Sequence, residues 1–405
     1  MSSKLPHQWP DGFLWGTGAS SIQTEGAPPS SDWWRWERNG NAPLSGTGNG
    51  FATHYKSDFA ALQQLGLTHH RLSIEWARIE PERGKYDLRA VEHYKSMLTA
   101  ARDIGISPWV CLHHFSLPQW FADEGGFLNR DNLHRYWSRH VEFMAQTFGD
   151  LVYGWKPVNE TNYYPMAAYK GRGWPPGIDD FETWMIAVEN MQIASAEAAI
   201  RLKQIGKPVS SVFGLSTVEL VDTLPSSKTF QDFVYAVNWD SGLDLFRDGE
   251  IRLPGREPVY RPELAGSFDI IGFSYYCALG VKDGQLVRFP ENAPMSQLEY
   301  SIWPDGLSLV LERLHNELPT TPLLIAEYGI GTEDDEQRAQ YLADGLRITA
   351  DAIGCGIDVR GFFHWTSVDN YEWLHGYDVK FGIIDDERRV RPSATVLANE
   401  AIKSF

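Results

Sequence analysis

The sequence has few cysteines, no long hydrophobic run and no excess of positive charge. Its three cysteines, Cys111, Cys277 and Cys355, lie far apart beside apolar residues, so we expect buried free thiols in a reducing compartment. Neither CxxC nor HExxH metal spacing occurs, and we expect no metal and no cofactor. No apolar run approaches membrane-spanning length, and the N-terminus lacks the apolar segment of a signal peptide. We therefore predict a cytoplasmic protein without a membrane partner.

The net charge of −17 argues against a nucleic-acid partner, because phosphate binding needs clustered Lys and Arg. Proline and glycine are spread throughout the 405 residues, with no linker, repeat or low-complexity tract. The 16 tryptophans exceed what a core alone requires, and an extended sugar-binding or apolar cleft is one explanation. Monomer and homo-oligomer both remain open.

Short apolar segments alternate with helical patterns along the chain. Strands are predicted at 13–20, 70–76, 106–115, 151–160, 209–215, 268–276, 321–329 and 359–368, and helices at 52–65, 87–104, 132–148, 181–205, 306–316, 333–353 and 394–405. Residues 222–266 are the least regular and should form short helices and an excursion. The alternation predicts parallel βα units closed into one α/β domain, a (β/α)8 TIM barrel over residues 1–405. A doubly wound open sheet is the alternative, but no Gly-rich phosphate motif follows the first strand.

Polar side chains stand where the predicted strands end, and in such barrels these ends line the active site. They are Gln23 and Glu25, Arg71 and Glu75, His114, Asn159 and Glu160, Tyr276, Glu327, and Trp365 with Asp369. Each alone has a structural explanation. Glu160 can cap the next helix, Arg71 can serve simply as an ion-pair partner of Glu75, and His114 can be a core histidine whose hydrogen bonds are all made within the protein. Their coincidence at strand ends favours a functional site, with Glu25, Glu75 and Asp369 as structural groups behind it.

Glu160 and Glu327, at the ends of the fourth and seventh strands, should face each other across the barrel mouth. Retaining glycoside hydrolysis uses one carboxylic acid and one carboxylate about 5–5.5 Å apart. Arg71 near Glu327 would keep that group ionised. Apolar surroundings and the neighbouring negative charge would raise the pKa of Glu160 and keep it protonated.

These residues resemble glycoside hydrolase family 1, the β-glucosidase-like retaining glycosidases, over nearly the whole chain. Asn159-Glu160-Thr161 stands where the family carries Asn-Glu-Pro, and Ala326-Glu327-Tyr328-Gly329 where it carries Thr-Glu-Asn-Gly. The resemblance implies that Glu160 is the acid/base and Glu327 the nucleophile. It also implies that Asn159 binds the sugar 2-hydroxyl, and that Arg71 and Tyr276 accompany the nucleophile.

The same resemblance assigns a sugar-binding set, comprising Gln23, His114, Phe115, Trp365, Glu372, Trp373 and Phe381. Glu372 would grip the 4- and 6-hydroxyls. The phospho-glycosidase branch has a Ser at that position, so a non-phosphorylated sugar is expected. The implied activity is that of a retaining exo-β-glycosidase on small β-D-glucosides, with β-galactosides and β-fucosides as further candidates.

The chain departs from the family pattern at Thr161, Tyr328, Phe115, Ser274 and Lys380, which leaves the preferred glycoside open. The excursion after the fifth strand looks trimmed, and we expect a more open aglycone side. A transglycosylase on the same scaffold is the alternative function. A non-catalytic carbohydrate-binding relative is disfavoured because both glutamates are present, and a metal-dependent barrel hydrolase because no His-x-His follows the first strand.

Overall fold

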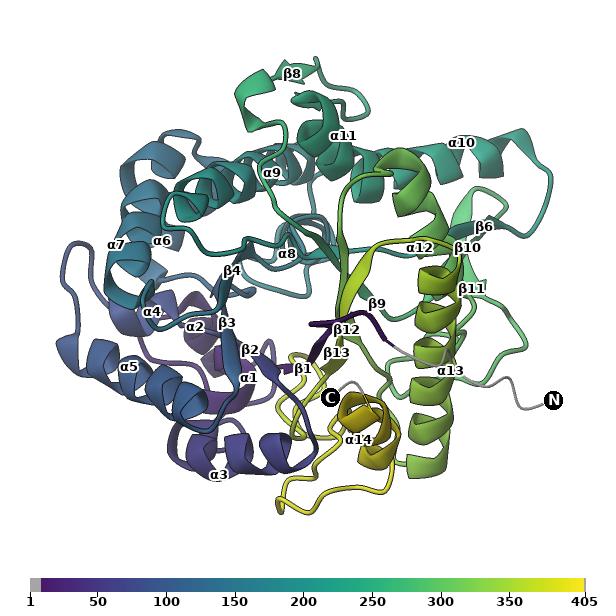
Figure 1. Cartoon of the computed structure of the whole chain (residues 1–405). Helices are drawn as coiled ribbons and strands as arrows, with labels where there is room; N and C mark the ends of the chain where they lie inside the picture. Colours follow the sequence, from purple (N-terminus) through teal and green to yellow (C-terminus); the bar gives the residue numbers. More distant parts are fainter. Residues whose placement is uncertain (1–8, 404–405) are drawn as a thin grey trace.

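The computed structural model describes residues 9–403, and its centre is an eight-stranded parallel sheet (Figure 1). The strands are, in spatial order, β4 (Gly154–Val158), β3 (Ser107–His113), β2 (His69–Ser73), β1 (Leu14–Gly18), β13 (Val359–Trp365), β12 (Leu323–Tyr328), β9 (Ile271–Tyr275) and β5 (Phe213–Gly214). A parallel bridge from Trp155 to Val209 joins β4 to the segment that enters β5, which closes the sheet into a barrel. The predicted (β/α)8 barrel is confirmed, and the open doubly wound sheet is wrong.

Helices surround the barrel at the predicted places. The main ones are α3 (Phe51–Gln64), α5 (Leu88–Asp103), α7 (Ser138–Phe148), α9 (Phe181–Lys203), α12 (Gly306–Glu317), α13 (Asp335–Gly354) and α14 (Ala394–Lys403). Aspartate side chains cap the N-termini of three of them, α5, α9 and α13. Asp87 accepts a hydrogen bond from the Arg89 N–H at 2.9 Å, Asp180 from the Thr183 N–H at 2.8 Å, and Asp334 from the Glu336 N–H at 3.0 Å. The helix predicted at 132–148 starts as a π-helical turn, η2 (Leu133–Trp137). The last two residues of the predicted C-terminal helix lie outside the described residues.

The barrel interior is filled by side chains. Leu14, Trp109, Val212, Leu324, Ala326 and Phe363 form a buried cluster inside it. The Lys156 ammonium lies in the same layer, 4.7 Å from the Phe363 ring centre and 5.7 Å from that of Trp109, and burial lowers its pKa well below the ordinary value. The barrel is therefore a packed core rather than a pore, as in TIM barrels generally, and an open site has to lie at one of its mouths.

The loops at the C-terminal ends of the strands contain structure that the sequence analysis did not assign. Short helices are α1 (Ser21–Glu25), α2 (Asp32–Arg38), α4 (Trp76–Ile79), α6 (Gln119–Asp123), η1 (Gly126–Leu128) and α8 (Tyr163–Tyr169). The irregular region 222–266 forms α10 (Pro225–Tyr235), η3 (Ala236–Asp240), α11 (Ser241–Asp248), the hairpin β7 (Glu250–Ile251) and β8 (Val259–Tyr260), and η4 (Pro262–Leu264).

A second, three-stranded sheet was missed entirely. It consists of β6 (Val218–Leu220), β10 (Ala278–Lys282) and β11 (Gln285–Phe289). The β10–β11 hairpin turns at Asp283-Gly284, where φ is 53° and 70°. Asp-Gly between two apolar segments is a strong hairpin signal, because both turn residues need positive φ. That signal was available in the sequence.

All three cysteines were expected to be buried, and this is wrong for two of them. All three are free thiols; Cys111 is buried, but Cys277 is half-buried and Cys355 is exposed. Cys355 follows directly on the last turn of α13, where the chain leaves the helix at the surface.

Within residues 9–403, no helix is long and apolar enough to cross a membrane, and no group of three His, Cys, Asp or Glu side chains could hold a metal ion.

Candidate functional site

A cavity of about 510 Å³ opens at the C-terminal ends of the barrel strands. It is lined by ten of the twelve predicted site residues, namely Gln23, His114, Phe115, Glu160, Tyr276, Glu327, Trp365, Glu372, Trp373 and Phe381. The other two, Arg71 and Asn159, lie directly behind this lining, where the Arg71 guanidinium donates to the Asn159 side-chain oxygen at 3.3 Å. The structure thus brings together all twelve predicted site residues.

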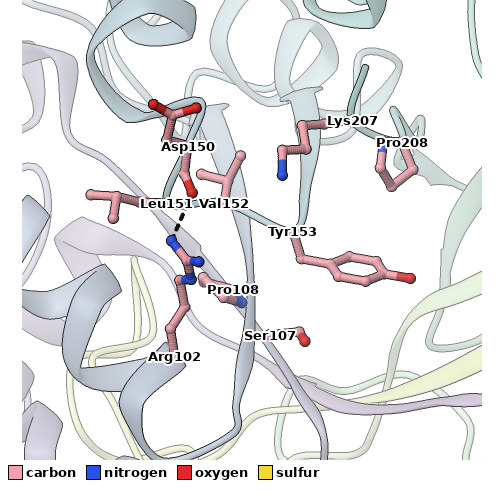
Figure 2. A pocket seen from close by; sticks show the side chains of 9 residues that line it. All are labelled: Arg102, Ser107, Pro108, Asp150, Leu151, Val152, Tyr153, Lys207 and Pro208. Carbon is pink, nitrogen blue, oxygen red and sulfur yellow. Dashed lines mark hydrogen bonds between the residues drawn. The ribbon is translucent and has the colours of Figure 1, made fainter. Parts of the chain in front are cut away.

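A second cavity, of about 370 Å³, lies at the opposite end of the barrel (Figure 2). Its lining comes from the segments that enter β3, β4 and β5, including Ser107, Asp150 and Lys207. Arg102 donates to the backbone oxygen of Asp150 at 2.7 Å across it. Asp150 is the one carboxylate among the described residues that line it, and the N-terminal ends of TIM-barrel strands serve stability rather than chemistry. The first cavity is therefore the candidate active site.

Glu327, near the end of β12, is held by a cation and a phenol. The fully buried Arg71 guanidinium forms an ion pair with its carboxylate, and the Tyr276 hydroxyl donates a hydrogen bond to its Oε2. Arg71 is itself fixed by donating to the Ala19 carbonyl at 3.2 Å and to His114 Nδ1 at 3.0 Å. Burial raises the pKa of Tyr276 well above its ordinary value, so its phenol remains a donor. These contacts stabilise negative charge on Glu327 and fix the orientation of its carboxylate.

Glu160, just beyond β4, has the opposite environment. Its side chain is buried against the backbone of Gly214 of β5, so closely that a Cβ on residue 214 would lie 3.2 Å from the Glu160 Cδ. Burial raises the pKa of Glu160 to about 7, although the Ser274 hydroxyl and Arg71 act in the other direction. No side chain caps α8, the helix that follows, so the capping interpretation of Glu160 is wrong. Of these two glutamates, Glu327 is therefore stabilised as an anion, whereas Glu160 keeps its proton up to about pH 7.

Polar groups for sugar hydroxyls lie around the two glutamates. His114 accepts from Arg71 through Nδ1, and burial lowers its pKa well below the ordinary value, so it is neutral and carries its proton on Nε2. The Asn159 Nδ2 is buried without a hydrogen-bond partner among the described residues. A buried donor without a partner costs about 1–3 kcal/mol, which a substrate hydroxyl can recover.

Gln23 and Glu372 form a second polar pair in the lining. The Gln23 amide donates to Glu372 Oε2 at 3.1 Å and to the Tyr371 carbonyl at 2.9 Å, and its oxygen accepts from Ser20 at 2.7 Å. Burial raises the pKa of Glu372 to about 8, and the charge of Glu160 adds to the effect. Both side chains are therefore held in place before any ligand binds.

Aromatic rings form the walls next to these groups. The Trp365 and His114 rings are parallel, with centres 5.7 Å apart, and Arg71 lies 5.0 Å from the centre of the Trp365 ring. Trp373 packs edge-on against the buried Trp33 at 4.6 Å. Phe115, Glu160 and Trp373 have φ of 70°, 46° and 29°. Positive φ is costly for such residues and is typical of functional sites held by the surrounding structure.

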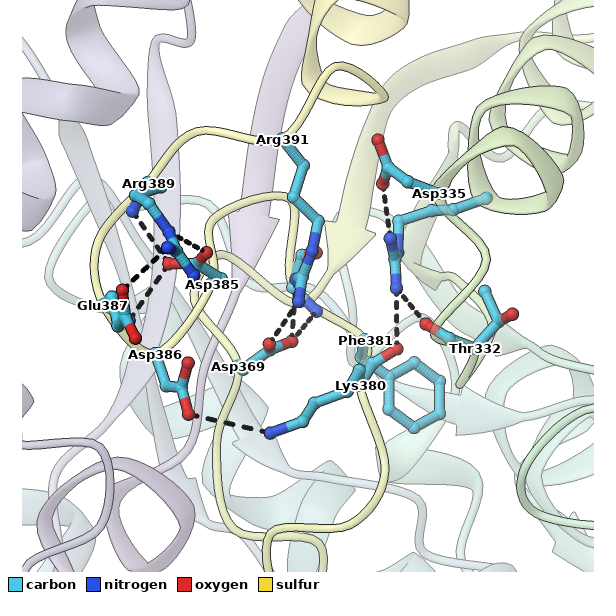
Figure 3. Close-up of polar contacts among 12 residues, drawn as sticks. Thr332, Asp335, Asp369, Lys380, Phe381, Asp385, Asp386, Glu387, Arg389 and Arg391 are labelled. Carbon is cyan, nitrogen blue, oxygen red and sulfur yellow. Dashed lines mark hydrogen bonds and ion pairs between the residues drawn. The ribbon is translucent and has the colours of Figure 1, made fainter.

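Ion pairs and hydrogen bonds, buried at Asp369 and Arg338, support the wall that contains Phe381 (Figure 3). Arg391 pairs with Asp369 at 2.6 Å, and Asp369 accepts from the Gly382 N–H at 2.8 Å. Arg338 donates to the Lys380 carbonyl at 3.0 Å. Asp369, like Glu25 and Glu75, lies outside the cavity lining. Glu75 accepts from the hydroxyls of Ser21 and Ser116, and Glu25 accepts from the Tyr94 phenol and pairs with Arg78.

The departures from the family pattern fall into two groups. Phe115 and Ser274 line the cavity. Thr161 instead donates to the Gln192 side chain at 2.9 Å, and Tyr328 donates to the Tyr341 carbonyl at 3.0 Å and stacks on its ring, so both side chains point into the surrounding core. The Lys380 ammonium lies 3.8 Å from Asp386 and is not part of the lining.

Much of the remaining lining was not predicted. It comprises mainly aromatic and aliphatic side chains. Those on α8, α9, α10, η3 and the β10–β11 hairpin include Tyr163, Met166, Trp184, Phe230, Phe233, Val237, Leu279 and Leu286, and those in loops include Trp174, Leu298 and Tyr300. Trp174 and Tyr163 belong to the aromatic loop after the fourth strand, and the Asp-Gly turn could have revealed the hairpin. Nothing in their own sequence pattern distinguishes Phe230 or Phe233 from ordinary core residues.

Comparisons with known proteins agree with this geometry. The model of the family "Glycosyl hydrolase family 1" matches residues 5–258 and 261–397. Beta-glucosidase A of Thermotoga maritima is 27% identical and is aligned over 93% of both chains. The beta-galactosidase of Saccharolobus solfataricus is also 27% identical, over 96% of this chain and 94% of its own. The solved structure of a beta-glycosidase from Pyrococcus horikoshii superposes with a TM-score of 0.90 at 30% identity, covering 99% of this chain and 96% of that one.

Proposed function

The chain belongs to glycosyl hydrolase family 1, whose members hydrolyse O-glycosidic bonds, and from this premise we propose that Glu160 and Glu327 perform a retaining hydrolysis of β-glycosides. One observation carries the assignment of roles. The two carboxyl groups line the same cavity, but Glu327 is paired with Arg71, whereas burial raises the pKa of Glu160 to about 7. A double displacement needs one ionised nucleophile and one protonated acid.

In the first step, the Glu327 carboxylate attacks the anomeric carbon while Glu160 donates its proton to the leaving oxygen. A covalent glycosyl-enzyme forms and the aglycone leaves as an alcohol. Arg71 and Tyr276 orient the attacking carboxylate. In the second step, the ionised Glu160 takes a proton from water, which attacks the anomeric carbon and releases Glu327. The sugar keeps its β configuration.

The sugar end of the cavity is formed by Gln23, His114, Asn159 and Glu372, with Trp365 as the apolar surface below the ring. We propose β-D-glucosides as substrates, with β-galactosides and β-fucosides as further candidates, and the two curated relatives above, one a glucosidase and one a galactosidase, support this range. No Lys or Arg is among the described residues that line the cavity, which favours a non-phosphorylated sugar.

Azide rescue tests the two roles separately. Glu327→Gly should be inactive, and azide should restore turnover of an activated aryl β-glucoside to give an α-glucosyl azide. Glu160→Ala should retain the first step with a 2,4-dinitrophenyl leaving group, and azide should then yield a β-glucosyl azide. Exchanged products would reverse the assignment. The absence of rescue in both variants would contradict the double displacement.

Transfer to an alcohol is the second candidate activity. The apolar outer part of the cavity favours it, because an alcohol held there could compete with water for the glycosyl-enzyme. Product analysis with added hexanol separates hydrolysis from transfer. Neither reaction requires a metal or a cofactor, so we expect EDTA to leave turnover unchanged. Loss of activity on chelation that returns with a divalent cation would contradict this.

We further propose that residues 1–405 form one domain, that the protein acts in the cytoplasm, and that its partner is the small glycoside. The three free cysteines support a reducing compartment, and the net charge of −17 disfavours nucleic acid. A single unfolding transition that is followed equally by fluorescence and circular dichroism supports one domain. Cell fractionation tests the location, and sedimentation gives the oligomeric state.

A further inference from the structure

One side of the active-site cavity is lined by a continuous apolar surface that the hydrolytic mechanism does not use. It is formed by Trp184, Phe230, Phe233, Val237, Leu279 and Leu286, which we call the apolar wall. These residues come from α9, α10, η3 and the β10–β11 hairpin. Figure 1 shows α10, β10 and β11 on the opposite side of the barrel from α1, which carries the sugar-binding Gln23. The cavity therefore has a polar end and an apolar end.

The apolar wall is preformed. Phe233 contacts Trp184 with ring centres 5.9 Å apart, and Phe230 with ring centres 6.0 Å apart and ring planes 18° from parallel. Behind them, Val218, Val234 and Val281 form a buried cluster against which Phe230, Phe233 and Leu279 pack. Leu286 is nevertheless 49% exposed, and Phe230 and Phe233 are only half-buried. Exposed apolar side chains gathered around a cavity mark a ligand-binding surface.

The proton donor lies between the two ends. Glu160 touches Gly214 of β5, and the chain then passes through Leu215 and Ser216, both in the lining, into β6 at Val218. β6 pairs with β10 and so carries the hairpin of the apolar wall. Because Glu160 protonates the glycosidic oxygen, a sugar on Gln23 and His114 places its leaving group on the far side of that oxygen, toward the apolar wall.

Asn162, a polar residue on this side of the cavity, has no free hydrogen-bonding group on its side-chain amide for a second sugar. Asn162 donates to the carbonyls of Gly214 at 2.6 Å and Asn238 at 2.9 Å and accepts from the Gly214 N–H at 3.0 Å, so its amide is already used by the protein. No charged side chain belongs to the apolar wall. Sugar hydroxyls placed against it would lose hydrogen bonds to water without replacement.

We propose that the apolar wall is the leaving-group subsite, and that it selects large apolar aglycones, such as aromatic or long-alkyl alcohols, over a second sugar. The proposal rests on the proposed function and specifies its substrate class. The sequence predicted a more open aglycone side, and the proposal specifies that this side is bounded by an apolar surface.

A series of alkyl β-D-glucosides tests the proposal without changing the chemistry, because methanol, butanol and hexanol are leaving groups of similar basicity. A fully buried methylene is worth about fourfold in affinity, so kcat/KM should rise at least about tenfold from methyl to hexyl glucoside even with partial burial. Cellobiose, whose leaving group is a hydroxylated ring, should lie below hexyl glucoside. p-Nitrophenyl β-glucoside monitors basal activity.

Two variants test whether the apolar wall causes the increase in kcat/KM from methyl to hexyl glucoside. Leu286→Gln changes an exposed residue on β11, and Phe230→Ala removes a ring on α10. Each should reduce the ratio of kcat/KM for hexyl glucoside to that for methyl glucoside to less than about threefold. Leu220→Gln is the matched control, because Leu220 is also exposed, in the same small sheet, but outside the lining. It should keep the full increase.

The apolar subsite would be overturned if kcat/KM did not increase with alkyl length, or if cellobiose were preferred to hexyl glucoside. If such an enzyme still hydrolyses p-nitrophenyl β-glucoside, the proposed function remains intact. A rise that persists in both apolar-wall variants would also overturn the apolar subsite. If no β-glycoside is hydrolysed at all, the proposed function fails and the subsite with it.

Discussion

The backbone of Gly214 lies directly against the carboxyl group of Glu160. A Cβ at position 214 would stand 3.2 Å from Cδ, 3.3 Å from Oε2 and 3.4 Å from Cγ of that glutamate. Gly214 is not among the residues with positive φ, so the close approach, rather than the backbone conformation, requires glycine here. The second residue of a two-residue barrel strand therefore sets the position of the proton donor and contributes to its burial.

Gly214→Ala should displace Glu160 by a few tenths of an ångström. Misplacement of a catalytic group by about 1 Å can cost about a hundredfold, so for this smaller displacement we expect kcat/KM for hexyl β-glucoside to fall about tenfold. A 2,4-dinitrophenyl glucoside, which needs no protonation to leave, should be much less affected. Gly354→Ala is the control, because a Cβ there meets nothing within 4 Å. Equal losses on both substrates would contradict an effect through Glu160.

Tyr276→Phe should remove a hydrogen bond to the nucleophile. Hydrogen bonds to charged groups contribute about 1.5–3 kcal/mol, so kcat/KM should decrease by about tenfold to a hundredfold. Tyr328→Phe is the matched control: it also removes one phenol, but that phenol donates to the Tyr341 carbonyl outside the cavity. It should lower the melting temperature and leave kcat/KM close to that of the wild type. A similar loss of activity in both variants would mean that Tyr276 acts only on stability.

Phosphorylation of the sugar should abolish turnover. Glu372 lies at the sugar end of the cavity, and the described lining offers no Lys or Arg to balance a phosphate dianion. We expect kcat/KM for p-nitrophenyl 6-phospho-β-glucoside to be at least about a hundredfold below that for the unphosphorylated compound, since an unpaired buried charge costs several kcal/mol. Comparable rates on the two compounds would contradict the assignment of Glu372 to the hydroxyl-binding end.

Activity should fall on the alkaline side of neutrality. Burial raises the pKa of Glu160 to about 7, so the proton needed by the leaving group is present below that pH and is lost above it. We expect the alkaline limb of kcat/KM against pH for hexyl glucoside to have an apparent pKa near 7. Under single-turnover conditions, the first step with a 2,4-dinitrophenyl glucoside should lack this limb. A limb shared equally by both substrates would assign the titration to another group.

The reacting residues could be located from the sequence because their positions at strand ends depend on the barrel rather than on side-chain packing. Alternation of apolar strands and helices determines which ends meet, and it brought Glu160 and Glu327 to the same mouth of the barrel. It could not separate them from Glu25, Glu75 and Asp369, which were also strand-end candidates but lie outside the lining. The sequence could not show which departures matter. Tyr328 is adjacent to the nucleophile, yet successive residues of a strand point to opposite faces, so its ring lies in the core beside Tyr341.

The apolar wall escaped prediction for a different reason. Its members come from five separate elements, and the sequence around each one alone is typical of a core residue. Leu286 and Phe230 become a ligand surface only because β10 pairs with β6, which places the hairpin beside α10 at the cavity. Which residues form such a surface depends on contacts between segments that are far apart in the sequence. The local signal that was available, the Asp283-Gly284 turn, identifies the hairpin but not its position.

The buried acid should also make stability depend on pH, and the sign follows from its raised pKa. Glu160 titrates near 7 in the folded protein against an ordinary value of 4.5. The folded state is therefore favoured fully below about pH 4.5, and the wild type should lose up to about 3 kcal/mol of unfolding free energy as the pH rises from 4.5 to 7. Glutamine does not titrate, so Glu160→Gln should be progressively more stable than the wild type over this window, with a constant difference above it.

Urea unfolding at pH 4.5, 6 and 7.5 measures this difference, since the variant is inactive but should keep the fold. Glu312→Gln is the control, because Glu312 is an exposed carboxylate on α12 and its replacement should give a small difference at every pH. A Glu160→Gln advantage that grows between pH 4.5 and 7.5 means that the protein sacrifices stability to keep a protonated acid in the cavity. An advantage independent of pH would show that Glu160 already ionises near its ordinary pKa, and the alkaline limb of the activity profile would then need another origin.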